Sequence, residues 1–175
     1  MESTADTNTD TNELIAEEIA RLALERGLVI GAAESLTGGA ISQELAKAPE
    51  ASEWYAGAVT AYRSQTKFRA LGVPEGPVIT AECATAMATG TCELLGADSA
   101  VAVTGAGGPG EEEGRPAGTV FIGVASAGDV AAFEHHFDGP PEDVVQATVT
   151  AALRHLLDRL ARDIPPPSDR TAARA

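Results

Sequence analysis

The chain has 175 residues, which is enough for one domain with a full hydrophobic core and too few for two comfortable ones. Its formal net charge of -14 argues against nucleic acid as a partner, because an acidic surface repels phosphate backbones and no basic patch offsets it. No window approaches the roughly 18 consecutive apolar residues of a membrane span, and the polar, acidic N-terminus does not resemble a signal peptide. We therefore expect a cytoplasmic protein.

The acidic residues are spread along the whole chain, while lysine occurs only at positions 47 and 67. This pattern is typical of a protein from a salt-loving host, where high ionic strength screens the repulsion between like charges. The alternative is an acidic mesophilic protein, whose negative charge serves solubility.

The hydrophobic pattern predicts a folded region over residues 12–162, between disordered tails at 1–11 and 163–175. Helical spacing and short apolar runs alternate within this region. The predicted elements are helix 13–27, strand 28–34, helix 37–48, strand 53–62, helices 63–72 and 80–96, strand 98–105, a hairpin of strands 117–126 and 129–137, and helix 141–161. Crossovers favour parallel strands and the hairpin requires an antiparallel pair, so we expect an α/β fold: a three-layer α/β/α single domain with a mixed, mostly parallel sheet.

Two possible sites, a dinucleotide-binding loop and a histidine metal site, do not fit the surrounding sequence. "GAGGPG" at 105–110 matches the dinucleotide-binding pattern, but a proline and three acids follow where a phosphate-binding helix should begin. We interpret it as a glycine-rich loop that approaches either a ligand or a facing loop closely. His135 and His136 are adjacent in a strand and point to opposite faces, and His155 lies alone on the last helix, so a surface or strand-edge position is expected for them.

The two cysteines, Cys83 and Cys92, lie nine residues apart in a predicted helix and therefore on opposite faces. We expect no disulfide between them. A cysteine-based metal site lacks enough ligands, and we expect neither a metal nor an organic cofactor.

The stretch "AAESLTGGAI" at 32–41 places hydroxyls and glycines where a buried strand gives way to a helix. Thr37 could simply cap the helix, with the glycines forming a tight turn. Ser35 could instead be a nucleophile, which needs a base to remove its proton. No Ser-His-Asp arrangement is convincing, so a lysine with a lowered pKa is the remaining type of base. Lys47 ends a helix, whereas Lys67 lies early in a short helix, five residues after Tyr62 at a strand end.

Three motifs, in this order, resemble the CinA C-terminal domain family. They are "AAESLTGG", "GAVTAYRSQTKFRALGV", and "VTGAGGPG" followed by "GRPAGTVFIGVA", and the resemblance covers roughly residues 14–160. Enzymatic members of this family are nicotinamide mononucleotide amidohydrolases. The family often has cysteine where Leu36 stands here, at a position that is not its proposed nucleophile. Long members carry an additional N-terminal domain with pyrophosphatase activity, which we do not expect here.

The resemblance implies that Ser35 is the nucleophile, Lys67 its activating base, and Tyr62 a hydrogen-bonding partner that orients the pair. Backbone N–H groups at 37–39 would serve an oxyanion or the ligand phosphate, and residues 104–107 would form the facing wall of the pocket. The substrate-binding residues implied in this way are Glu34, Thr37, Gly38, Gly39, Thr104, Gly105, Gly107 and Arg115.

One departure from the family concerns the phosphate. The family often shows "GDR" and a further arginine before the last helix, whereas this chain has "DGPPEDVVQAT" without a basic residue. Arg115 and Arg63 are the nearest candidate cations. The resemblance implies hydrolysis of nicotinamide mononucleotide to nicotinate mononucleotide and ammonia in pyridine nucleotide recycling, and it suggests a homo-oligomer. The alternative is a non-catalytic or altered-specificity nucleotide-binding module of the same family.

Overall fold

The structure, a computed structural model, describes residues 4–162. Eleven elements follow one another along the chain, and each predicted helix and strand has a counterpart among them. Their bounds are α1 (Thr4–Arg26), β1 (Ile30–Glu34), α2 (Ala40–Lys47), α3 (Ala51–Trp54), β2 (Tyr55–Thr60), α4 (Ser64–Leu71), α5 (Ala81–Leu95), β3 (Ser99–Gly105), β4 (Thr119–Ser126), β5 (Asp129–His136) and α6 (Pro141–Arg162).

The strands form one five-stranded sheet in the order β2-β1-β3-β4-β5. β1 pairs in parallel with both β2 and β3, while β3–β4 and β4–β5 are antiparallel. The predicted mixed sheet is confirmed, but parallel pairings make up half of the total rather than most of it. The reason is that β4 follows β3 as its antiparallel neighbour without an intervening helix.

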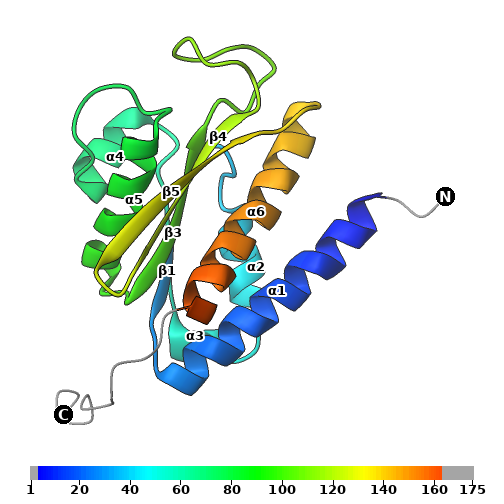
Figure 1. The fold of residues 1–175 in the computed structure, drawn as a ribbon, viewed down its shortest axis with the longest axis vertical. Coiled ribbons are helices and arrows are strands. Elements are labelled where there is room, and N and C mark those ends of the chain that lie inside the picture. Colours follow the sequence, from blue (N-terminus) through cyan, green and yellow to red (C-terminus); the bar gives the residue numbers. More distant parts are fainter. Residues whose placement is uncertain (1–3, 163–175) are drawn as a thin grey trace.

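Helices cover both faces of the sheet, which confirms the α/β fold (Figure 1). α1, α2 and α6 lie on one face and α4 and α5 on the other. The first face buries large aliphatic side chains, among them Ile19, Ile122 and Leu156. The second combines residues of α5 and of the segment 71–79 with small side chains from the strands, mainly alanines. β3 and β4 are almost wholly buried because both of their faces are covered.

The hairpin and the close packing of α5 both depend on backbone geometry. Ala127 and Gly128 connect β4 to β5 with positive φ angles of 54° and 79°, as a two-residue turn of the type that fits twisted strands requires. A Cβ at Gly123 would lie 2.2 Å from the carbonyl oxygen of Ala84, so α5 rests directly on the β4 backbone. This explains the many small residues in α5.

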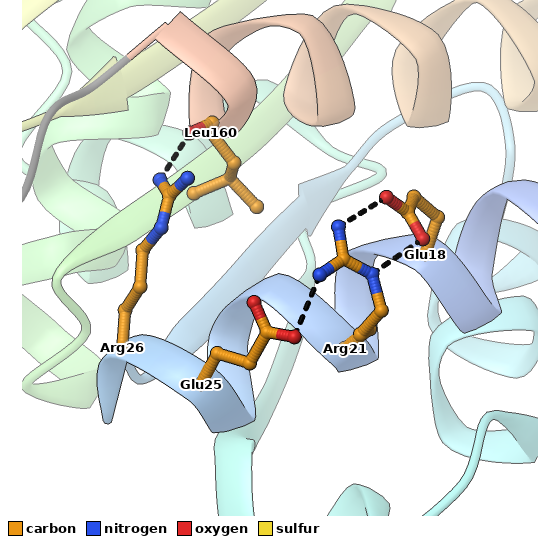
Figure 2. A network of polar contacts seen from close by, with 5 residues as sticks. All are labelled: Glu18, Arg21, Glu25, Arg26 and Leu160. Atoms are coloured by element: carbon orange, nitrogen blue, oxygen red, sulfur yellow. Dashed lines mark hydrogen bonds and ion pairs between the residues drawn. The ribbon is translucent and has the colours of Figure 1, made fainter.

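The polar surface of α1 carries a short ionic network next to the contact between α1 and α6 (Figure 2). Arg21 bonds Glu18 and Glu25 on its own helix, three and four residues away. Arg26 donates to the main-chain carbonyl of Leu160, which joins the C-terminal ends of α1 and α6. That bond caps a free carbonyl in the last turn of α6.

The two ends of the chain were both predicted to be disordered tails. α1 begins at Thr4 rather than near Asn12, so most of the segment expected to be an N-terminal tail is helical. Once a helix is nucleated, each added residue gains a backbone hydrogen bond, and the polar sequence does not prevent this. The predicted tail from residue 163 onward lies outside the described residues. Among residues 4–162, no helix has the length and hydropathy needed to cross a membrane.

His135 and His136 lie on β5, an edge strand of the sheet, as predicted, but the prediction that His155 lies alone is wrong. His155 is not alone: its Nε2 lies 2.8 Å from Nε2 of His135, across the contact between α6 and β5. The two rings stack on Phe133 and Phe137, and burial lowers the pKa of both imidazoles. The pair is half-buried because α6 packs against the sheet, which residue spacing alone did not show.

Candidate active site

Ser35 directly follows β1, at the carboxyl end of this central strand of the sheet. β2 and β3 flank β1 on opposite sides, so the loops that follow β1 and β3 diverge above the sheet. Ligands of open α/β sheets bind in the crevice that such a divergence creates. Ser35 itself is only 8% exposed.

A buried carboxylate organises the corner next to this serine. Glu34 is fully buried, and its Oε2 accepts the hydroxyl of Thr37 at 2.7 Å and the N–H groups of Gly39 and Ile41 at 3.0 and 3.1 Å. Its Oε1 accepts the N–H of Ser42 at 2.7 Å. These donors belong to the start of α2, whose N-terminal N–H groups have no intrahelical acceptors. Glu34 therefore fixes the path of the chain on both sides of Ser35.

Lys67 approaches Ser35 from the next part of the chain. It lies in α4 and is 1% exposed, and its Nζ is 2.9 Å from Oγ of Ser35. The ammonium also donates to the main-chain carbonyls of Ala61 at 2.8 Å and Tyr62 at 3.4 Å. All three acceptors are uncharged oxygens, so no carboxylate in the described part of the chain pairs directly with this buried cation.

This environment destabilises the charged form of Lys67 relative to a lysine in water. Burial lowers the pKa of Lys67, and the more distant charges of Glu113 and Glu112 oppose that shift only partly. Cys83 lies nearby, and burial raises the pKa of its thiol to about 11, so it stays protonated and neutral. A lysine with a lowered pKa beside a serine hydroxyl is an arrangement that can activate the hydroxyl for nucleophilic attack.

The Ser35 side chain opens into a cavity of about 440 Å³. Its wall combines the loop after β1, the end of β2, the glycine-rich loop after β3 and the first turns of α6. The lining residues are Ser35, Leu36, Tyr62, Gly105, Gly107, Gly108, Glu112, Pro141, Glu142, Val145 and Gln146. The volume suits a small-molecule ligand.

The residues predicted to surround Ser35 separate into two groups. Gly105 and Gly107 line the cavity, and Gly105 has no room for a Cβ, which would lie 2.5 Å from the carbonyl oxygen of Thr119. Thr104 faces away from the cavity, because its hydroxyl donates to the carbonyl of Val78 inside the protein. Tyr62 lines the cavity with a ring that is 70% exposed, and it is its main-chain carbonyl that contacts Lys67.

Two of the three N–H groups expected to serve a ligand, those of Gly38 and Gly39, are engaged within the corner. Gly39 donates to Glu34, and Gly38 donates to the carbonyl of Ser35 at 3.1 Å. Thr37 is buried and donates its hydroxyl to Glu34. Glu34 makes its contacts beneath the corner and does not line the cavity. These contacts fix the shape of the corner that carries Ser35.

Both candidate arginines lie outside the cavity lining. The guanidinium of Arg115 is 4.0 Å from the carboxylate of Glu134 and lies over the ring of Phe121. Arg63 is exposed at the N-cap of α4, where its carbonyl accepts backbone N–H groups. No cluster of three or more potential metal-ligating side chains occurs among residues 4–162.

Sequence reasoning missed two contributors to the site. The first turns of α6 supply part of the cavity wall. Glu113 holds the glycine-rich loop in place: it has a φ of 51°, and its carboxylate accepts the N–H groups of Val78 and Ile79 at 2.8 and 2.9 Å. The three consecutive acids at 111–113 were the available signal, since a carboxylate in such a loop can accept main-chain N–H groups, as Glu113 does just before α5.

Comparison with known proteins agrees with this architecture. Residues 12–160 match the CinA C-terminal domain. The chain belongs to the CinA C-terminal domain family. A CinA-like protein from Geobacter metallireducens is 38% identical over 154 residues, which covers 85% of this chain and 37% of that protein. A CinA-like protein from Geobacter sulfurreducens is 34% identical over 148 residues, covering 81% of this chain and 36% of that protein.

Crystal structures of CinA superfamily proteins have the same fold as this CinA domain. One from Escherichia coli is 32% identical with a TM-score of 0.83, covering 90% of this chain and 94% of that one. Another from Klebsiella pneumoniae is 31% identical with a TM-score of 0.81, covering 86% and 98%. The chain spans little more than a third of the length of the curated relatives it matches.

Proposed function

We propose that this CinA domain is an amidohydrolase in which Ser35 is the nucleophile and Lys67 the general base. The observation that carries the proposal is the 2.9 Å contact between Lys67 Nζ and Ser35 Oγ at the base of a cavity, with the lysine 1% exposed and bonded only to uncharged oxygens. A surface lysine would stay protonated, whereas this one has a lowered pKa.

The reaction begins with the neutral amine of Lys67. As Ser35 Oγ bonds to the carboxamide carbon, Lys67 accepts the hydroxyl proton. The tetrahedral intermediate then collapses, the C–N bond breaks, and the proton held by Lys67 passes to the leaving NH2 nitrogen, which departs as ammonia. Water next attacks the resulting ester while Lys67 accepts its proton, and that proton returns to Ser35 Oγ as the acid is released.

Nicotinamide mononucleotide, the substrate that the family resemblance implies, is the first compound to test. We expect the protein to release ammonia from it, and we expect Ser35→Ala to abolish that release while the protein remains folded. Binding of the nucleotide without ammonia release by the unmodified protein would contradict the proposal and support a non-catalytic binding module.

A further inference from the structure

The α6 wall of the cavity is negatively charged. Pro141, Glu142, Val145 and Gln146 line it, and Glu142 lies in the first helical turn together with Asp143. Between residues 137 and 153 the sequence contains no lysine or arginine. A helix N-terminus can attract a phosphate, but here the helix's own acidic residues occupy the region of positive potential.

The wall formed by the glycine-rich loop after β3 is also negatively charged. The glycine-rich loop contributes main chain at Gly105, Gly107 and Gly108, and its lining residue with a charged side chain is Glu112. Both Glu112 and Glu142 are exposed. Each of the two walls therefore contributes an exposed glutamate to the lining of the cavity.

The described cations do not compensate for these carboxylates. Lys67 is buried and does not line the cavity, and its acceptors are Ser35 and two main-chain carbonyls. Arg63 and Arg115 lie outside the lining. Among the described residues that line the cavity, the charged side chains are two carboxylates, and a phosphate dianion would therefore enter a negatively charged lining.

On the basis of the proposed amide hydrolysis, we propose that the cavity selects a carboxamide that carries no phosphate, on an uncharged or positively charged ring. Glu112 and Glu142 are the specificity-determining residues. In an N-substituted nicotinamide the pyridinium ring is a cation directly attached to the reacting carboxamide. When that carboxamide reaches Ser35, the ring lies in the cavity that the two carboxylates border.

The phosphate group decides the sign of the net charge of the ligand. A phosphate monoester carries about two negative charges at neutral pH, so the mononucleotide is an anion overall, whereas its riboside is a cation. Like charges near a protein surface raise the free energy of the complex and slow the encounter, while opposite charges do the reverse. Because both glutamates are exposed, salt weakens the discrimination.

The test compares ammonia release from nicotinamide mononucleotide and nicotinamide riboside by the full chain. At low salt we expect kcat/KM for the riboside to exceed that for the mononucleotide at least about tenfold, with the ratio shrinking in molar salt. Calorimetric binding of both compounds to the Ser35→Ala protein measures the same preference without turnover. Equal or better use and binding of the mononucleotide would overturn the charge selection while leaving the amidohydrolase proposal intact.

Variants assign the preference to the two glutamates. Glu142→Gln and Glu112→Gln should each reduce the riboside preference about threefold at low salt, and Glu142→Arg should reduce it further or reverse it. Glu111→Gln is the matched control, because Glu111 is an exposed acid on the same loop that does not line the cavity. An equal effect of the control would show a general field and overturn the assignment.

The outcomes separate the two proposals. Tighter binding of the riboside without hydrolysis of either compound refutes the proposed chemistry and supports the charge selection. Binding of neither compound to the folded protein overturns both.

Discussion

Glu34 and Lys67 are both buried beside Ser35, yet their surroundings differ. The carboxylate of Glu34 accepts four fixed donors at the start of α2. The ammonium of Lys67 has three uncharged oxygen acceptors and no direct anionic partner. A fully hydrogen-bonded buried charge holds structure in place, whereas a buried charge without a counter-ion shifts toward its neutral form. We therefore propose a scaffolding role for Glu34 and a catalytic role for Lys67.

The largest effect should come from Ser35, the group that both regions surround. Ser35→Ala should lower turnover at least about a thousandfold, because the covalent route is removed. Its unfolding midpoint should stay close to that of the unmodified protein, since only a hydroxyl is lost. A steady-state ammonia assay with a urea unfolding curve measures both quantities. Retained turnover in the folded variant would refute the mechanism.

Lys67 should be almost as important for turnover, and arginine should not replace it. Lys67→Arg keeps a positive charge but cannot supply a neutral base, so it should lose turnover nearly as severely as Lys67→Ala. Substrate binding, measured separately, should survive better than turnover in the arginine variant. Near-normal turnover with arginine would instead make residue 67 an electrostatic anchor.

The lowered pKa of Lys67 gives pH dependence a defined sign. The neutral amine is the base, so kcat/KM should rise with pH through a midpoint below the ordinary lysine value. Between the folded and unfolded pKa values the unfolded chain binds more protons, so the free energy of unfolding should also rise with pH there. Lys67→Met should remove this contribution, which urea unfolding at several pH values can measure. A stability profile identical in both proteins would contradict the lowered pKa.

Glu34 should affect stability more than any other residue of the corner. Glu34→Ala leaves buried donors without an acceptor, so we expect a loss of about 3 kcal/mol in the free energy of unfolding. Turnover should fall as well, because Ser35 is no longer held in place. Thr37→Val is the matched control, since it removes one donor and keeps the carboxylate. An effect of Glu34→Ala no larger than that of the control would make the scaffold role wrong.

Salt concentration should have the smallest effect on stability. It should act on the exposed acids and hardly on the buried charges of Glu34 and Lys67. Molar salt shortens the Debye length to about 3 Å, so repulsion among exposed acids should weaken and Tm should rise by a few degrees. The contact between Lys67 and Ser35 is buried, and the acidic limb of the pH profile should move little. Thermal unfolding between low and molar salt measures the first effect. An unchanged Tm would contradict adaptation to a salt-loving host.

Much of the local structure could be predicted from the sequence. The hairpin at Ala127–Gly128 and the short helix carrying Lys67 were both found from spacing and turn residues. These features depend on neighbours within a few positions, where hydrophobic period and backbone preference decide the outcome. The start of α1 at Thr4 was not found, because helix propagation into polar sequence leaves no hydrophobic pattern.

The sequence by itself determined which residues could do chemistry: a serine at a strand-to-helix corner and one lysine early in a helix. Tertiary structure decided what surrounds them. Two acceptors of Lys67 are main-chain carbonyls, which leave no signal in side-chain identity. Glu142 reaches the cavity from α6, more than a hundred positions after Ser35, because the sheet order brings the start of α6 over the carboxyl ends of β1 and β3. Such contacts depend on how the layers pack, so residue spacing cannot reveal them.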